Sequence, residues 1–245
     1  MNRYFIIINL RTLVAIIISI ITPIIAYKYN ISYDIDLSLI SIAIVFPLVF
    51  TIRSSFRRRE KALEHLSQFR GAIKTIDYLF KTSITIPNEK RIEISDILVE
   101  VSDTVTAHLK GNDFDTKNID DTVEKISIFM SENRESLPKR LTDRIIRFMN
   151  DLHEAIDNLH AIHTHRTPIS LKAYCLVFIY IFPLVYTPTI LSRIGTDGTI
   201  WITYFVVILS EFILISLYNI QDHMEYPFDQ DGLDDINLNI FKINR

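Results

Sequence analysis

The stretch Leu37–Ile52, with the sequence LSLISIAIVFPLVFTI, contains no charged residue and runs directly into a basic segment. Within it Ile42, Phe46 and Phe50 recur at a spacing of four, so on a helix these bulky side chains share one face. The residues between them are also mostly apolar, so the spacing is not that of an amphipathic surface helix. It indicates a row of bulky side chains on a membrane helix, which either packs against a neighbouring helix or lines a narrow pore.

The other apolar residues of the chain are also grouped. Of the 245 residues, 49% are hydrophobic and 22% are charged, and the hydrophobic ones are concentrated in a few segments. The four apolar segments are Tyr4–Tyr27, Leu37–Ile52, Leu171–Leu191 and Thr199–Ile220. Because a spanning helix needs about 20 mostly apolar residues, the sequence predicts an all-α protein with four transmembrane helices. The first segment lacks a small-residue cleavage site, so we expect it to be retained rather than removed as a signal peptide.

The basic residues after the second apolar segment set the expected orientation. Arg53, Arg57 and Arg58 follow it directly, and positive charge favours the cytoplasmic side. We therefore expect a multi-pass protein of the cell membrane with both termini in the cytoplasm. The expected domains are two transmembrane helices in 1–52, a cytoplasmic helical region in 53–170, two further transmembrane helices in 171–220, and an acidic cytoplasmic tail in 221–245. The second apolar segment would span only about 24 Å, which suits a helix shielded from lipid by its neighbours.

The segment 53–170 is expected to be helical, because apolar residues recur there at helical spacing. The expected helices lie within 56–80, 92–109, 120–131 and 141–163, and the second membrane helix should continue into the first of them. Four histidines lie near the end of the last helix: His153, His160, His163 and His165. The spacing of three between His160 and His163 would allow a shared metal ion, but the neighbouring acids show no ligand spacing, which favours a solvated or interhelical role.

Two ionisable residues lie within the apolar segments. Glu211 is near the middle of the fourth, and Arg11 is within the first. A charge inside a membrane is costly and usually faces protein or water. Three alternatives follow: the two residues pair with each other, Glu211 faces an aqueous cavity, or Glu211 is hydrogen-bonded between helices while Arg11 extends to the cytoplasmic interface.

The tail after the fourth apolar segment is acidic. Pro227 should end that helix, and Asp229, Asp231, Asp234 and Asp235 follow it closely. Alternating acids in a loop can bind a hard cation such as Ca²⁺, which makes Asp231 and Asp234 candidate calcium ligands. The spacing is not that of an EF-hand, and composition alone favours a solvated loop. No other cofactor is indicated.

The chain shows no catalytic pattern. It has no glycine-rich phosphate loop, no GxSxG motif and only five glycines, so we do not expect an enzyme. Cys175 is the single cysteine, which excludes an intrachain disulfide. The basic run lies next to a membrane helix, which indicates orientation or anion attraction and not nucleic-acid binding.

Taken together, several of these segments resemble the bestrophin family of anion channels. Ile42, Phe46 and Phe50 are similar to the family's pore-lining segment, in which an apolar residue and two aromatics at a spacing of four form a narrow neck. As in that segment, an arginine, Arg58, follows eight residues after the second aromatic. Two further stretches are similar to family motifs: 166–174, where the third span begins, and 225–234, with its Pro-Phe pair and acids.

The resemblance implies a homopentamer with a central pore whose neck is the row of three bulky residues. It implies inorganic anions such as chloride as the permeating partners, attracted by Arg53, Arg57 and Arg58, with membrane lipid around the assembly. The family has a second, cytoplasmic constriction, which by position we place at Met149 or Leu152. The acidic run is interrupted relative to the family pattern, which leaves calcium binding open. The alternative function is a non-channel four-span scaffold or sensor, which need not form a closed ring.

Overall fold

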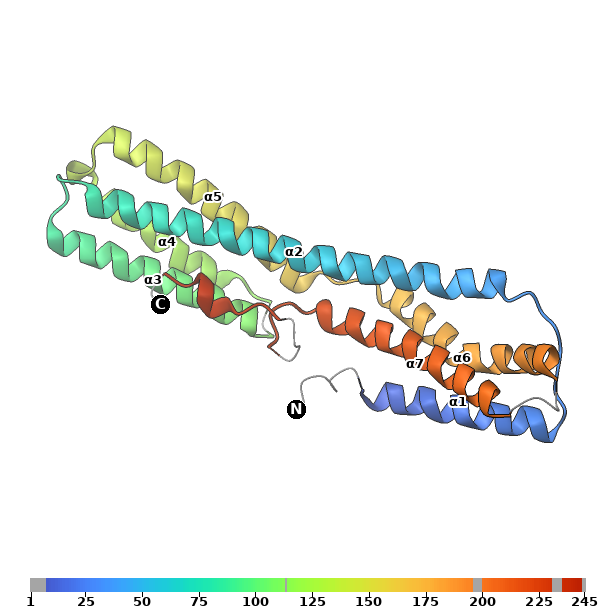
Figure 1. Cartoon of the computed structure of the whole chain (residues 1–245). Coiled ribbons are helices and arrows are strands. Elements are labelled where there is room, and N and C mark those ends of the chain that lie inside the picture. The colour runs from blue at the N-terminus through green and yellow to red at the C-terminus, as the bar shows by residue number, and fades with distance from the viewer. Residues whose placement is uncertain (1–7, 113, 196–199, 231–234, 244–245) are drawn as a thin grey trace. The chain divides into compact units, whose positions relative to one another are not determined.

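The computed structural model describes residues 8–112, 114–195, 200–230 and 235–243, and these residues form helices and their connections without a strand among them (Figure 1). The prediction of an all-α fold is confirmed. The α-helices are α1 (Leu10–Lys28), α2 (Ser38–Thr82), α3 (Asn88–Lys110), α4 (Lys117–Glu132), α5 (Lys139–Thr164), α6 (Ile169–Ile194) and α7 (Ile200–Met224). Two short 3-10 helices follow α4 and α7, at Arg134–Ser136 and Leu238–Phe241.

The chain divides into two compact units. Unit 1 consists of Met1–Arg57 and Thr167–Glu225, and unit 2 consists of Arg58–Arg166 and Tyr226–Arg245. All four apolar segments of the sequence fall in unit 1. Helix α2 contributes its first part to unit 1 and its remainder to unit 2, as expected for a membrane helix that continues without a break past Ile52.

Unit 1 contains α1, α6, α7 and the first part of α2, and Figure 1 shows α7 alongside α1 and α6. The face of α1 that is buried in this unit carries small and hydroxyl side chains, including Thr12, Ala15, Ser19 and Ala26. Small residues let helix backbones approach closely, which drives helix association where the hydrophobic effect between helices is absent. The core of unit 1 also includes buried side chains of the other three helices: Ile44, Leu48, Cys175, Ile179, Phe182, Leu214, Ile215 and Tyr218.

Among the residues that the structure describes, four helices are long and apolar enough to cross a membrane. They lie at Leu10–Lys28, at Ser38–Thr82, within Lys139–Ile194 and at Ile200–Met224. In the third of these, α6 supplies the apolar part, because α5 carries many charged residues. Four prolines lie inside these helices without ending them, as membrane helices tolerate: Pro23, Pro47, Pro183 and Pro188. The chain is therefore a multi-pass membrane protein.

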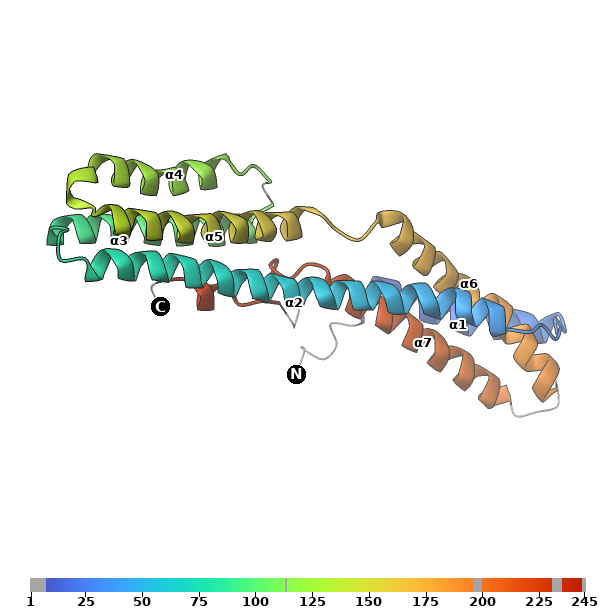
Figure 2. The same ribbon diagram turned by 90° about the horizontal axis from the view of Figure 1, so that it is seen from above.

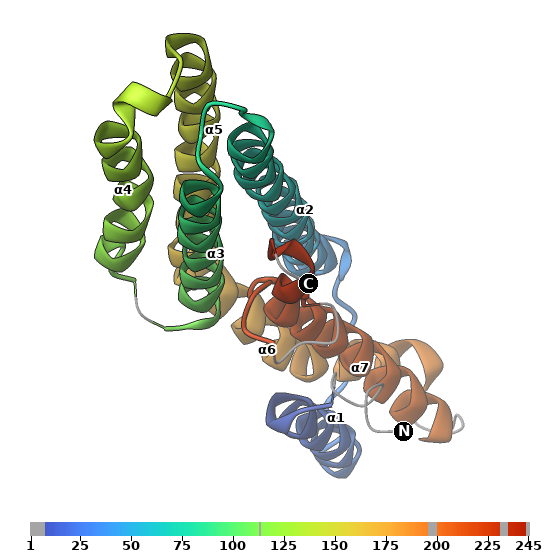
Figure 3. The same cartoon turned by 90° about the vertical axis from the view of Figure 1, so that its left-hand side faces the viewer.

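Unit 2 contains α3, α4, α5, the rest of α2 and the tail. Helix α4 lies against α3, and α5 lies beside α3 (Figures 2 and 3). Their apolar faces enclose one continuous core with the face of α2 that bears Phe69 and Phe80. Phe80 meets Phe129 of α4 edge to face, with ring centroids 5.6 Å apart. The tail adds Phe228, Ile236 and Leu238 to this core.

The helix ends of unit 2 follow from proline and glycine. Helices α3 and α5 begin directly after Pro87 and Pro138, whose fixed φ angle suits the first turn of a helix. Helix α3 ends at Gly111, the break that the sequence predicts. Helix α5 ends at Thr164, and Pro168 lies directly before the first residue of α6.

A candidate pore-lining face on helix α2

Within unit 1, helix α2 has two opposite faces. Ile44 and Leu48 lie on the buried face and are 2% and 1% exposed, and Thr51 and Ser55 continue this face. Their spacing of four, three and four residues is that of one helix stripe. This stripe attaches α2 to its own protomer, and it does not include the bulky row found in the sequence.

The bulky row lies on the other face. Ile42, Phe46 and Phe50 are 59%, 61% and 53% exposed. The rings of Phe46 and Phe50 meet edge to face, with centroids 4.8 Å apart and an interplanar angle of 80°. The row is therefore a continuous apolar and aromatic surface that the single chain leaves uncovered, and such a surface usually meets a partner, a ligand or lipid.

Two of the three arginines proposed for anion attraction extend this exposed face. Arg53 follows Phe50 by three residues, Arg57 follows Arg53 by four, and both are exposed. Arg58 differs, because it is only partly exposed and its guanidinium donates a hydrogen bond to the backbone carbonyl of Ile162 in unit 2. Arg53 and Arg57 thus share the face of the row, whereas Arg58 ties α2 to the end of α5.

The second constriction proposed at Met149 or Leu152 stays a prediction. Both side chains are buried, at 7% and 0% exposed, and belong to the core of unit 2. To line an opening between copies of the chain, one of them would have to leave this core. The apolar spacing on α5 that singled them out is the spacing of a core-facing stripe.

A polar network joins the ends of α6 and α7 in unit 1. Glu225 is 1% exposed and accepts hydrogen bonds from the backbone N–H of Thr167 at 2.8 Å and from Lys172 Nζ at 2.7 Å. Lys172 also pairs with Asp222, whose other carboxylate oxygen accepts from Arg11 Nη1 at 2.8 Å. Arg11 therefore pairs with Asp222, which corrects the alternative in which it pairs with Glu211.

The same network reaches the buried face of α2. Gln221 is fully buried, and its Nε2 lies 3.3 Å from both Ser55 Oγ and Glu225 Oε2. Ser55 lies five positions after Phe50, so this contact holds α2 close to the exposed row. The network was not expected from the sequence, although the charged residues at the ends of two apolar segments, Lys172 and Asp222, were a usable signal.

Glu211 lies in the middle of α7 and is 0% exposed. Neither of its carboxylate oxygens has a hydrogen-bond partner among the described residues. The described residues therefore do not support the alternative in which Glu211 is hydrogen-bonded between helices. A buried polar group without a partner is costly in a protein interior, which keeps Glu211 a candidate functional residue.

The candidate calcium ligands Asp231 and Asp234 lie outside the described residues. Within the described ranges, histidine, cysteine, aspartate and glutamate side chains form no group of three suited to hold a metal ion. The tail that carries the acids begins in unit 2 with Tyr226, over whose ring the Arg166 guanidinium lies at 4.4 Å.

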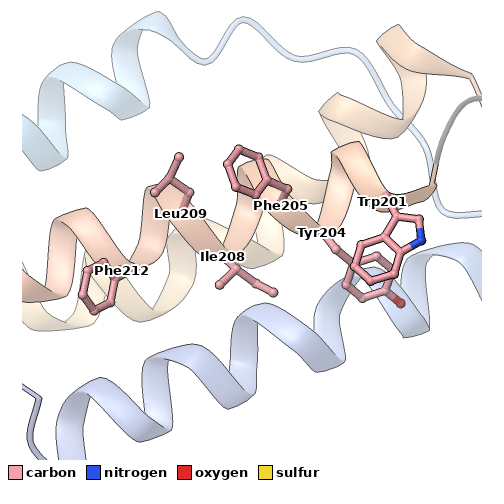
Figure 4. A pocket seen from close by; sticks show the side chains of 6 residues that line it. All are labelled: Trp201, Tyr204, Phe205, Ile208, Leu209 and Phe212. Carbon is pink, nitrogen blue, oxygen red and sulfur yellow. The ribbon is translucent and has the colours of Figure 1, made fainter.

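The outward surface of α7 forms an apolar pocket of about 350 Å³ (Figure 4). Its lining consists entirely of side chains from α7: Trp201, Tyr204, Phe205, Ile208, Leu209 and Phe212. Near the same end of the helix, Tyr27 of α1 stacks on Tyr204 at 6.5 Å and its hydroxyl contacts Thr203 Oγ1 at 3.2 Å. Aromatic side chains at the end of an apolar helix are typical of a membrane interface.

The helical fold and the apolar surface of α7 are those of an all-helical, multi-pass membrane protein. No protein-family model matches the sequence, and no curated protein matches it. The chain is similar to crystal structures of a bacterial bestrophin homologue from Klebsiella pneumoniae, one of which shares 17% identity at a TM-score of 0.79 and covers 94% of this chain and 93% of that one. Two variants of the same protein give TM-scores of 0.80 and 0.78 at 17% identity, covering 94% and 98% of this chain and 91% and 95% of theirs.

This similarity extends over almost the whole chain, including both units. At 17% identity it establishes the fold. The chain has the fold of a bacterial bestrophin homologue, and the resemblance seen in the sequence is confirmed at that level.

Proposed function

We propose that this chain forms a homopentameric ion channel that conducts anions such as chloride. The observation that carries the proposal is the uncovered row of Ile42, Phe46 and Phe50, opposite the face by which α2 packs in its own protomer. In a ring of five copies, these rows face one another across a central axis. A closed cyclic assembly uses a surface that a single chain leaves exposed.

The chemistry of the row suits a narrow neck. Rings of bulky apolar side chains can gate a pore by dewetting. The edges of phenyl rings carry partial positive charge, so Phe46 and Phe50 can favour a partly dehydrated anion. Arg53 and Arg57 extend the same face, and their charge raises the local concentration of anions at one end of the neck.

The proposed setting is the cell membrane, with the four apolar helices spanning it and both termini in the cytoplasm. The region 53–170 then lies in the cytoplasm, where Arg53 and Arg57 follow the positive-inside preference. Lipid is the proposed neighbour of the outward surface of α7, because its pocket has a purely apolar lining of aromatic and aliphatic side chains. We assign the chain no enzymatic activity.

Chloride flux from liposomes that contain the purified protein tests the proposal. Phe46→Ala should change conductance or anion selectivity, because it widens the neck and removes a ring edge. Phe205→Ala is the matched control, since Phe205 is an exposed aromatic of α7, 65% exposed against 61% for Phe46. Phe205→Ala should leave the permeation properties unchanged. A wild type that passes no ion, or that is not a five-fold assembly, would support a scaffold or sensor instead.

A further inference from the structure

Three histidines of unit 2 meet where two helices end. His108 is in the last turn of α3, and His160 and His163 are in the last two turns of α5. The ring centroid of His108 lies 5.3 Å from that of His160 and 5.5 Å from that of His163. We call these three residues the histidine cluster. Nothing in the proposed channel function uses it.

The first pair in the cluster shares a hydrogen bond. His108 Nε2 and His160 Nδ1 are 3.1 Å apart, so one nitrogen donates and the other accepts. This bond needs at least one of the two rings to be neutral, because both nitrogens of a protonated imidazole are donors. Two protonated rings at this distance would lose the bond and repel each other. The pair can therefore keep this hydrogen bond with one proton bound, but it loses the bond when both rings are protonated.

His163 adds a partly buried ring to the pair. Its Nε2 is buried and has no hydrogen-bond partner among the described residues. Burial lowers the pKa of His163 below its usual value, and the charges of His108, Arg166 and His160 lower it further, while the Gly111 carbonyl acts in the opposite sense. The neutral form of His163 is thus the form that the folded unit accommodates.

The charges around the cluster are mostly positive. Arg166 follows α5, Arg58 of α2 binds the carbonyl of Ile162 next to His163, and Lys110 ends α3. On the tail, the ring of Tyr226 lies against the Arg166 guanidinium. Asp229, which directly follows Phe228 in the sequence, is the nearest acidic residue of the tail. The C-terminal ends of α3 and α5 favour a cation nearby. Each further proton then enters a site that is already positive.

The tail is anchored directly on this cluster. Phe228 is 2% exposed, and its ring centroid lies 6.2 Å from that of His163, which also lies 5.3 Å from the ring centroid of Phe114. Two hydrogen bonds then fold the tail on itself: the backbone N–H of Ile236 donates to the carbonyl of Pro227 at 2.9 Å, and the Gln230 side-chain Nε2 donates to the carbonyl of Ile236 at 3.0 Å. Farther along, the tail has other contacts with α3: Lys110 Nζ donates to Asn239 Oδ1 at 3.2 Å, and Lys242 pairs with Asp103 at 2.7 Å. Displacing Phe228 removes the attachment that lies on the cluster itself.

We propose that the histidine cluster is a proton-binding site that holds the tail from Tyr226 onward on α3 and α5 at neutral pH and releases it on acidification. Proton linkage gives the direction of the pH effect. Because the released state binds more protons than the attached state, the attached state loses stability as the pH falls through the ordinary pKa range of histidine, around 6.5. Entry of the second and third protons separates the rings, and the contact between His163 and Phe228 is lost.

Spin-label distances in the full-length protein test this inference. Labels are placed at Glu154→Cys on α5 and Ile240→Cys on the tail, in a Cys175→Ala background, because both label sites are exposed. With the labelled chain diluted into unlabelled chain, so that any assembly carries at most one labelled copy, the wild-type cluster should give one narrow distance at pH 7.5 and a broad, longer distribution at pH 5.5. His163→Phe keeps an aromatic ring near both Phe114 and Phe228 but cannot bind a proton, so the distance between its labels should stay narrow at both pH values.

Two further variants keep the result decisive if His163→Phe misfolds. His160→Asn removes one titrating neighbour, so the midpoint of the transition should move to lower pH by about one unit, or about tenfold in proton affinity. His153→Gln, an exposed histidine of the same helix outside the cluster, should behave as wild type. An unchanged wild-type distance at pH 5.5, or release in His163→Phe equal to wild type, overturns the inference. Ion flux is not measured, so the outcome does not depend on the channel proposal.

Discussion

Helix α2 behaves differently in the two units that it enters. In unit 2 its large apolar side chains, such as Phe69 and Phe80, are buried against other helices of the same chain. In unit 1 its largest apolar side chains, Phe46 and Phe50, point away from the chain, and smaller ones make the internal contacts. Unit 2 therefore buries the large apolar side chains of α2 by itself, whereas unit 1 leaves some of them uncovered and able to contact another molecule.

The largest expected effect is a loss of stability, and it should differ between a buried and an exposed phenylalanine of α2. Phe69→Ala removes a ring that is 1% exposed and leaves a cavity, so it should lower the free energy of unfolding by about 3–5 kcal/mol. Phe50→Ala should change stability far less, because the ring is already uncovered in the protomer. Thermal or denaturant unfolding followed by circular dichroism measures both. Equal losses would show that the row on α2 is part of an internal core.

The next effect concerns the network that fixes α2 in unit 1. Lys172→Met leaves the buried Glu225 without its cation and should destabilise unit 1 by about 3 kcal/mol, whereas Lys172→Arg should retain most of the stability. Lys61→Met is the control, because Lys61 and Glu64 form an exposed pair that should contribute little. Melting curves of the three variants in one detergent provide the comparison. A Lys172→Met variant as stable as wild type would mean that the network does not hold α2.

The smallest effect should be visible only in ion conduction. Arg57→Gln removes a charge from the exposed face without touching a core, so stability should not change. Anion current should fall at about 0.01 M salt, where charges act over about 30 Å, and the difference should vanish near 1 M, where they act over about 3 Å. Arg140→Gln, an exposed arginine of unit 2, is the control. A loss of current that is independent of salt would argue against anion attraction by Arg57.

Periodicity and breaks predicted most of the helices, because these signals are local. The uninterrupted junction at Ile52–Arg53 correctly indicated one long helix, and Gly111 correctly indicated a helix end. The position of the region 53–170 in the cytoplasm stays a prediction. So does the assembly into a pentamer.

The sequence did not determine what each helix packs against. Almost every residue of Leu37–Ile52 is apolar, so the sequence could not decide which face of α2 is buried. Met149 and Leu152 have the spacing of a core stripe, and only the packed structure shows that the core is their own. Arg11 and Asp222 are 211 residues apart, so their pairing depends on how α1 packs on α7.

The isolated carboxyl group of Glu211 bears on how the chain enters the membrane during synthesis. In the finished unit the side chain is enclosed by protein, but α7 alone would present it to lipid. An acid at the centre of an inserting helix costs about 2.5–3.5 kcal/mol on insertion scales, which the other residues of α7 must offset. Helix α7 should therefore insert most readily when α1 and α6 are already beside it. A change at Glu211 would then alter the yield of correctly inserted chains more than the stability of those that have folded.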